Sequence, residues 1–470
     1  MAVDLVIKNC RVALSTGLVE TGLVIDGGKI VSIAKDALLP PADEVIDCKK
    51  RIVLPGGIDF HVHFMDLGYA KREDWRTGTE SAAAGGTTFV VEHGHTNPPS
   101  TTRENLGKII KEAKKKAVVD FRINGAVTSQ NLMELPTLAA EGVSVFGEIY
   151  MAESIPELER VGDGVLLEAF KIIRDLNCVA GVHAEDWEII SHLTKKLKKL
   201  GRKDPLAHLE SRPDIAEEVA VYKALFLARR TSVRLHIFHL STKGGLKLIE
   251  KAKAVGQDVS VEVCPHHLLF EKRDVVKYGP YLKCNPPIRS EENRRSLWEG
   301  LRKGVIDMIS TDHWPLPKSE KEVGWDDIWK TEAGMPGVET RIPLLLTYGV
   351  QKKLITMETF LKTISENPAR RLGLYPRKGT IAVGSDADLV IVDLKERTKI
   401  KAEKMHTKCD FTPYEGWEVV GMPSLTLVRG KVVMDGGEIV SKPGYGLYFP
   451  SESKSTYRLG IRDIAPNGQT

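Results

Sequence analysis

The chain has 470 residues, 42% of them hydrophobic and 28% charged, with a formal net charge of +4, as in an ordinary globular protein. This small charge gives no reason to expect nucleic acid or a membrane surface as a partner, and no apolar run approaches the ~18 residues of a membrane helix. The six cysteines are scattered without a CxxC pair, so we expect neither a disulfide framework nor a zinc knuckle, and a reducing cytoplasm fits.

Short strands are predicted over residues 1–54, at 4–9, 23–26 and 30–33. The sequence Asp26-Gly27-Gly28-Lys29 between the last two is typical of a hairpin turn. No helical periodicity interrupts this segment, which therefore predicts a small β module.

From residue 52 short β-branched runs alternate with longer amphipathic stretches, a pattern typical of parallel sheets. Strands are predicted at 52–61, 87–92, 118–124, 143–150, 178–183, 233–239, 259–264 and 306–311, with helices between them, for example at 103–116, 215–229, 244–254 and 291–303. Eight such strands predict a (β/α)8 barrel over 55–374. A doubly wound open sheet is the alternative, but no glycine-rich phosphate loop follows the first strand.

The pattern returns to β over 375–440, with strands expected at 387–393, 425–428 and 431–434. Each terminal β segment is too small to bury a core alone, so we expect the two to fold together into one discontinuous module. Residues 441–470 form a C-terminal tail, and its aromatic residues Tyr445, Tyr448 and Phe449 suggest an arm that contacts another subunit.

Potential metal ligands gather at the predicted strand ends. Alternate residues of a strand share a face, so His61 and His63 lie side by side. The other candidates come from the ends of four later strands: Glu148, His183, His239 and Asp312. Each alone could be an ordinary polar residue. Because the C-terminal ends of barrel strands meet at one rim, the set predicts a metal site.

The ligand types indicate hydrolysis. Divalent ions held by histidine and carboxylate lower the pKa of bound water to about 7 and polarise a carbonyl group. Asp312 can bind metal, take a proton from the attacking water and pass it to the leaving nitrogen. This chemistry suits an amide or a related C–N bond.

An ordered series of motifs resembles the amidohydrolase superfamily, and in particular its cyclic-amidase branch of hydantoinases (dihydropyrimidinases), allantoinases and dihydroorotases. The resemblance extends from the early hairpin to about residue 435. Its main markers are Pro55-Gly56-Gly57-Ile58-Asp59-Phe60-His61-Val62-His63, Gly85-Gly86-Thr87-Thr88, Val182-His183-Ala184-Glu185, His239-Leu240-Ser241, Glu262-Val263-Cys264-Pro265-His266-His267-Leu268, Asn285-Pro286-Pro287-Ile288-Arg289 and Thr311-Asp312-His313.

The resemblance implies a barrel with a small β-sandwich built from both chain ends, and assembly as a homodimer or homotetramer. It implies one or two divalent ions, zinc first, with manganese, cobalt or iron as alternatives. His61 and His63 would hold the more buried ion, His183 and His239 the second, and Asp312 would be ligand and general acid/base. Backbone groups around two further positions would hold the substrate ring: Asn285 and Gly337.

The fourth predicted strand departs from the family pattern, because it contains no lysine. Most of this branch bridges its two metals with a carboxylated lysine there, so none is expected here. Alignment puts Glu148 at that place, and a one-residue shift would put Gly147 there. A glutamate could bridge, but it is shorter. The site could shrink, hold one metal or recruit another ligand, or Glu148 could be a plain polar strand residue.

Other departures concern the substrate. Dihydroorotases carry an arginine just after the His-x-His pair, whereas Phe64-Met65-Asp66 follows here, and His95 replaces a family asparagine. His93 and His95 could bind substrate, supplement the metal site or form a polar loop. Glu153 stands near the place of a tyrosine that is usual in hydantoinases.

The sequence thus predicts a metal-dependent enzyme that opens a five- or six-membered ring amide or ureide, closer to allantoinase or hydantoinase than to dihydroorotase. A dihydroorotase-type enzyme is one alternative. The alternative from another class is a non-catalytic oligomeric scaffold similar to the dihydropyrimidinase-related proteins. The missing lysine favours this alternative, whereas the four convergent histidines and Asp312 oppose it.

Overall fold

The computed structural model describes residues 2–14, 17–155 and 158–452. Its larger part is a barrel of parallel strands: β8 (Gly57–Val62), β9 (Thr87–Glu92), β10 (Asp120–Ile123), β11 (Val145–Tyr150), β12 (Val179–His183), β13 (Arg234–Ile237), β14 (Val259–Val263) and β15 (Met308–Ile309). They pair in chain order in two runs, β8 to β10 and β11 to β15. Parallel bridges between Gly125 and Phe146 and between Val62 and His313 close the ring. The predicted (β/α)8 barrel is confirmed.

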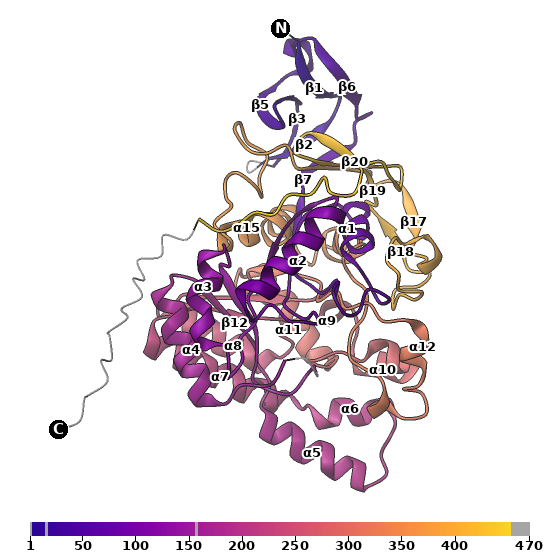
Figure 1. Cartoon of the computed structure of the whole chain (residues 1–470). Coiled ribbons are helices and arrows are strands. Elements are labelled where there is room, and N and C mark those ends of the chain that lie inside the picture. The colour runs from indigo at the N-terminus through magenta and orange to yellow at the C-terminus, as the bar shows by residue number, and fades with distance from the viewer. Residues whose placement is uncertain (1, 15–16, 156–157, 453–470) are drawn as a thin grey trace, which may run out of the picture.

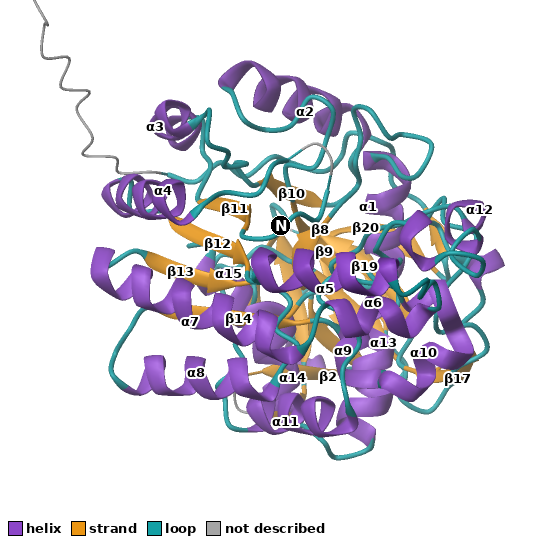
Figure 2. Ribbon diagram, turned by 90° about the horizontal axis from the view of Figure 1, so that it is seen from below, coloured by secondary structure: helices purple, strands orange, loops and turns teal. Residues whose placement is uncertain are grey.

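Helices surround these strands (Figure 2). They are α1 (Trp75–Ala84), α2 (Arg103–Lys116), α3 (Leu135–Ala140), α4 (Asp163–Asp175), α5 (Trp187–Lys199), α6 (Pro205–Ser211), α7 (Asp214–Thr231), α8 (Lys243–Ala254), α9 (Pro265–Leu269), α10 (Lys272–Tyr278), α11 (Glu291–Arg302), α12 (Lys318–Glu322), α13 (Arg341–Leu345), α14 (Met357–Leu361) and α15 (Asn367–Arg371). The four helices predicted from periodicity correspond to α2, α7, α8 and α11. Among the residues described, no helix is both long and apolar enough to span a lipid bilayer.

The run 52–61, predicted as one strand, is two strands in different sheets. β7 (Ile52–Pro55) pairs with strands of the terminal sheet, whereas β8 opens the barrel. The chain changes sheets at Gly56 and Gly57, whose N–H groups donate to Asp388 on one side and to Gly86 on the other. A Cβ at Gly56 would lie 2.1 Å from the Thr88 hydroxyl, so only glycine fits at this crossing.

Both chain ends contribute to one seven-stranded sheet. The N-terminal strands that do not belong to this sheet stand beside it in Figure 1. Its order is β21 (Glu438–Ile439), β20 (Lys431–Asp435), β19 (Pro423–Val428), β16 (Leu389–Val392), β7, β2 (Arg11–Leu14) and β3 (Gly17–Glu20). A second sheet has the order β5 (Lys29–Ala34), β4 (Gly22–Asp26), β1 (Val3–Lys8) and β6 (Ala42–Asp47). One apolar cluster joins the two sheets, so the termini form a separate sheet-rich domain. A small pair, β17 (Arg397–Lys399) and β18 (Glu418–Val420), lies outside both sheets.

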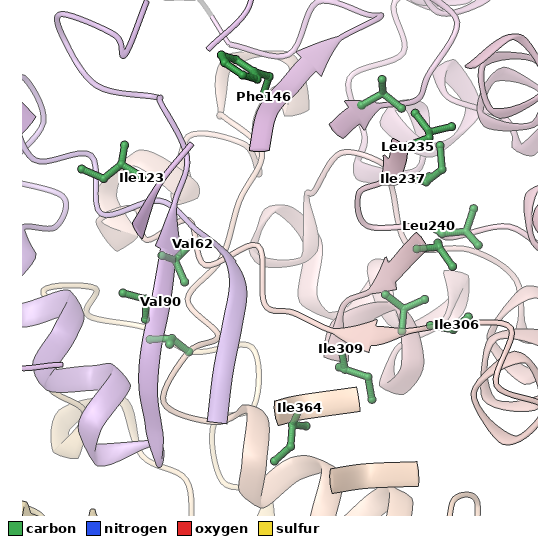
Figure 3. Packing of buried hydrophobic residues seen from close by; sticks show 14 of the residues in the cluster. Val62, Val90, Ile123, Phe146, Leu235, Ile237, Leu240, Ile306, Ile309 and Ile364 are labelled. Carbon is green, nitrogen blue, oxygen red and sulfur yellow. The ribbon is translucent and has the colours of Figure 1, made fainter. Parts of the chain in front are cut away.

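The main core lies between the barrel strands and their helices, and Figure 3 shows some of its side chains. Leu235 and Ile237 of β13 belong to this outer core, as do Val259, Val261 and Val263 of β14. Successive strand residues point to opposite faces, so the residues between them point into the barrel. Glu262 is one of these inward residues, and it is fully buried.

The tail follows the barrel of its own chain. Phe121 of β10 donates its N–H to Leu447 and accepts a hydrogen bond from the N–H of Phe449. Arg122 donates to the Phe449 carbonyl at 2.7 Å, and the Phe449 side chain is buried. Residues up to 452 thus contact the barrel of their own chain, the expected intersubunit arm stays a prediction, and the rest of the predicted tail, 453–470, lies outside the described residues.

Candidate metal centre

The first histidine pair lies at the C-terminal rim of the barrel. The Nε2 atoms of His61, in β8, and His63, just after it, are 3.1 Å apart, and both side chains are fully buried. His61 Nδ1 lies 2.6 Å from a carboxylate oxygen of Glu262. This contact orients the ring so that Nε2 faces His63. Two nitrogen atoms facing each other at this distance suit a shared cation.

The second pair comes from β12 and from the residues after β13. His183 Nδ1 and His239 Nε2 are 3.0 Å apart. The other ring nitrogen of His183, Nε2, lies 2.9 Å from Glu185, and the Arg212 guanidinium donates to the same carboxylate oxygen. In each pair, one imidazole thus contacts a buried carboxylate through the ring nitrogen that faces away from its partner histidine. Such a contact is typical of histidines that bind metal.

Glu148 lies between the two pairs. One carboxylate oxygen, Oε1, is 2.7 Å from His239 Nε2 and 3.5 Å from His183 Nδ1. The other, Oε2, is 3.5 Å from His61 Nε2 and 3.7 Å from His63 Nε2. Burial raises the pKa of this carboxyl, but the His61 charge and hydrogen bonds from three imidazoles bring it well below its usual range. Glu148 is therefore an ionised group with one oxygen toward each histidine pair.

The shifted alignment that puts Gly147 at this place does not fit the structure. A Cβ at Gly147 would lie 2.6 Å from the Gly181 carbonyl oxygen, so no side chain is accommodated there. Tyr150, which also follows in β11, donates its hydroxyl to Glu148 Oε2 at 2.8 Å.

Asp312 lies just after β15 and faces the first pair. Its Oδ1 atom is 3.4 Å from His61 Nε2 and 3.3 Å from His63 Nε2, and its side chain is 13% exposed. Asp59 positions this segment, because its carboxylate accepts hydrogen bonds from the N–H and hydroxyl of Thr311. Asp312 is thus fixed to the barrel but remains open to the cavity above it.

A cavity of about 920 Å³ opens over this rim. Glu148, His183, His239 and Asp312 form its floor, and Asn285 lines its wall. Its volume is far larger than a five- or six-membered ring and lies within the range of ordinary ligand pockets.

Two expected substrate residues lie elsewhere. His95 is buried beneath Trp314, with the two rings stacked at 4.3 Å, and Trp314 lines the cavity in its place. Gly337 donates its N–H to His313 Nδ1, and its carbonyl accepts from the N–H groups of Thr340 and Arg341. Asn285 is therefore the one of the three predicted substrate residues that the structure brings to the cavity.

His93 packs behind the centre. Its ring stacks on that of His61 at 4.0 Å, and its Nε2 atom lies 3.3 Å from the Phe60 carbonyl. Burial, and then the nearby charges of His61 and His63, bring the pKa of His93 well below its usual value, so the ring is neutral. One of its nitrogens belongs with His61, His63 and Glu148 to a group of potential ligand atoms within 4.8 Å of one another.

Sequence reasoning missed the supporting residues Glu262, Glu185, Tyr150 and Trp314 as parts of the site. Two of them carried a usable signal. Glu262 alternates with the outward valines of β14, and Tyr150 follows Glu148 by two residues. Nothing in the sequence indicated the partners of Glu185 or the position of the Trp314 ring.

The C-terminal rim of this closed parallel barrel brings imidazoles and carboxylates together. The protein therefore belongs to the class of (β/α)8-barrel proteins with a candidate metal site at that rim. A family model described as Amidohydrolase family matches residues 52–433, and the chain belongs to this family.

Relatives match over almost the full length. The chain is 38% identical to an L-hydantoinase of Paenarthrobacter aurescens, over 95% of this chain and 97% of that protein. It is 39% identical to a dihydroorotase of Methanosarcina acetivorans, over 96% of both chains. The solved structure of the L-hydantoinase (dihydropyrimidinase) from Arthrobacter aurescens is similar with a TM-score of 0.93, at 38% identity, over 95% of this chain and 99% of that one.

Proposed function

We propose that this protein is a metal-dependent hydrolase that opens the ring C–N bond of a small cyclic amide, such as a hydantoin-, allantoin- or dihydropyrimidine-like ureide or imide. The observation that carries the proposal is the convergence of four histidines and two carboxylates at one cavity, with Glu148, His183, His239 and Asp312 on its floor and His61 and His63 buried beneath. The full-length similarity to a hydantoinase supports the same reaction class.

In this proposal His61 and His63 would hold the more buried metal ion, and His183 and His239 would hold the second. Glu148, which has one oxygen toward each pair, would be a ligand to both, and no carboxylated lysine would be needed. The facing ring nitrogens and the carboxylate-held imidazoles fit such ions. Nitrogen and oxygen donors favour zinc first, with manganese, cobalt or iron as alternatives. The ions supply an activated water and polarise the substrate carbonyl.

Asp312 carries the proton in this mechanism. Its Oδ1 atom lies at the first histidine pair, and its side chain opens to the cavity. It accepts a proton from the attacking water and donates it to the ring nitrogen as the C–N bond breaks. Asn285 orients the ring, because its side-chain carbonyl oxygen is buried with no hydrogen-bond partner among the described residues, and the residue lines the cavity.

Dihydroorotate is the second candidate substrate, and the 39% identity to a dihydroorotase favours testing it. No arginine follows His63, and the buried Phe64 and Met65 stand there instead. A substrate carboxylate would need another cation. Arg212 and Lys283 line the cavity, but each is already bound to protein oxygen atoms, which leaves Arg160 of the cavity wall as the cation that would hold such a carboxylate. Because no arginine follows the His-x-His pair, the uncharged ring amide remains the leading substrate class.

We also propose that the enzyme works in the cytoplasm as a homodimer or homotetramer. The six unpaired cysteines suit a reducing compartment. The resemblance to the cyclic-amidase branch is the basis of the proposed assembly.

The test measures bound metal per subunit and ring opening over hydantoins, allantoin, dihydropyrimidines and dihydroorotate, for the wild type and Asp312→Asn. We expect hydrolysis of at least one ring amide after loading with zinc, manganese or cobalt, and loss of at least a thousandfold in kcat in Asp312→Asn. Normal hydrolysis by Asp312→Asn would refute the proton route. Absence of bound metal and of any metal-dependent rise in melting temperature would favour the non-catalytic scaffold.

A further inference from the structure

A second kind of ligand group lies just after β14, where the chain enters α9. Cys264 is the residue before the helix, and His266 and His267 lie in its first turn. All three side chains are buried, and one donor atom of each lies within 4.8 Å of the other two. The group shares no residue with the two groups of potential ligands around Glu148. It is therefore a separate cluster, which the proposed hydrolysis does not use.

The contacts of His267 show which of its ring nitrogens is available. Its Nε2 atom lies 3.0 Å from the Pro286 carbonyl oxygen. A carbonyl oxygen only accepts, so Nε2 carries the proton and Nδ1 carries the lone pair. Burial brings the pKa of His267 well below its usual value, so the ring is neutral. Nδ1 is buried and has no hydrogen-bond partner among the described residues. A histidine whose outer N–H is held by a backbone carbonyl is oriented as metal-binding histidines are.

His266 adds a second available nitrogen beside the first. Its ring lies against that of His267, with the centroids 4.3 Å apart. Burial lowers the pKa of His266 to about 3, so this ring is neutral as well. Its Nε2 atom is buried, and the described part of the chain offers it no hydrogen-bond partner. Burying a polar atom without a partner is costly, and an ion bound between the two rings would remove that cost.

Cys264 supplies the third donor and determines which ion suits the cluster. Its side chain is fully buried and makes no capping hydrogen bond to α9. Thiolate sulfur favours soft ions such as copper(I), and one cysteine with two histidines is the donor set of trigonal copper sites. Burying a net charge is unfavourable. One thiolate and two neutral imidazoles cancel the single charge of copper(I), whereas they would leave a divalent ion with a net positive charge.

We propose that Cys264, His266 and His267 bind one copper(I) ion per chain, independently of the proposed hydrolytic centre. Burial raises the pKa of the Cys264 thiol well above its usual range, so the free thiol carries a proton. This proton leaves as the copper–sulfur bond forms, one proton for each ion, and the copper stays in the same oxidation state. Donor atoms around one such ion lie roughly 3.5–4 Å apart, so small rotations of the three side chains complete the site.

The first test adds copper(I), as its acetonitrile complex under argon, to the full-length protein with its metals as purified, in the presence of the chelator bicinchoninate. We expect one copper per chain and a near-ultraviolet thiolate-to-copper absorption band. Cys264→Ser should lose the band and bind copper more than about a hundredfold more weakly, since losing a ligand exceeds the cost of losing a supporting group. Cys178→Ser is the matched control, because it replaces a buried thiol outside the ligand groups, and it keeps both signals. A wild type that binds no copper, or a folded Cys264→Ser that binds it unchanged, would overturn the proposal.

X-ray absorption of the copper-loaded wild type identifies the ligands without any substitution. We expect one sulfur and two imidazole nitrogens around the copper. Copper surrounded by nitrogen and oxygen alone would place it among the histidines of the rim and overturn the proposal. Glu148→Gln should keep this copper, because Glu148 belongs only to the rim groups. Neither measurement depends on ring opening, so the copper site and the hydrolytic function can fail separately.

Discussion

Replacing Glu148 by glutamine removes a charge that faces all four histidines of the proposed metal centre while keeping the shape of the side chain. One oxygen lies 2.7 Å from His239, and the other lies 3.5 Å from His61. Glutamine keeps an oxygen on one side only and turns an N–H₂ group, which cannot bind a metal, toward the other. If Glu148 bridges two ions, this change removes a ligand from one ion and a negative charge from both.

The size of the effect follows from burial. Glu148 is 5% exposed, so water replaces little of the lost interaction. Removing one partner from a buried charged contact costs about 3–5 kcal/mol. At about 1.4 kcal/mol for each factor of ten, the affinity for metal falls about a hundredfold to several thousandfold. Wild-type protein with two ions per subunit should therefore retain one or none in Glu148→Gln after dialysis.

The assay is metal per subunit by mass spectrometry after dialysis against metal-free buffer, followed by a titration with cobalt(II) read in the visible spectrum. Glu153→Gln is the matched control, because Glu153 lines the same cavity but is exposed and makes none of the histidine contacts given above. It should bind metal as the wild type does. If Glu148→Gln kept both ions with unchanged affinity, the bridging role would be refuted.

Two further predictions concern the metal centre, and a third concerns the contact between the barrel and the terminal domain. Glu262→Gln should weaken metal binding about 10–100-fold in the same titration, because the carboxylate that orients His61 Nδ1 is lost; an unchanged affinity would contradict this. Lys378 is buried and bridges one aspartate of the barrel and one of the terminal domain, at 2.8 and 2.6 Å. Lys378→Ala should therefore cost about 3–5 kcal/mol and lower the melting temperature, unlike an exposed lysine. Burial opposes protonation of His183, but two carboxylates outweigh it and raise its pKa to about 9. The buried carboxylates around His61 also raise its pKa. Metal must displace these protons, so affinity should rise by at least about tenfold per pH unit as the pH increases toward 9, as zinc titrations at several pH values would show.

The barrel and its rim could be predicted because both depend on local pattern. Alternating β and helical periodicity predicted the strands, and parallel strands bring their C-terminal ends together whatever the loops do. This pattern was sufficient to predict that His61, His183 and His239 lie at the rim. The split between β7 and β8 could not be predicted in the same way. The two strands are separated by Gly56 alone, and only their long-range partners show that they belong to different sheets.

Of the three residues expected to bind substrate, only Asn285 lines the cavity in the described structure. His95 and Gly337 lie on connections, where a single bulky neighbour decides what reaches the cavity. Trp314 is that neighbour for His95, and its indole ring covers the imidazole. The ambiguity between Gly147 and Glu148 had the same origin. An alignment cannot show how much space each position has. In the structure no side chain fits at position 147, beside Gly181, so the bridging position is that of Glu148.

The electrostatics of the rim bear on whether the missing lysine means a missing metal. The barrel buries Glu148, Glu185 and Glu262 together with several imidazoles, and burying ionised groups costs several kcal/mol for each. A scaffold that needed only its shape would lose nothing by replacing these groups with packed apolar residues, and it would gain stability. Their retention in mutual contact is explained if cations offset the cost. Glu148 then takes the role of the carboxylated lysine, although its side chain is shorter. It can do so because one of its oxygens lies toward each histidine pair.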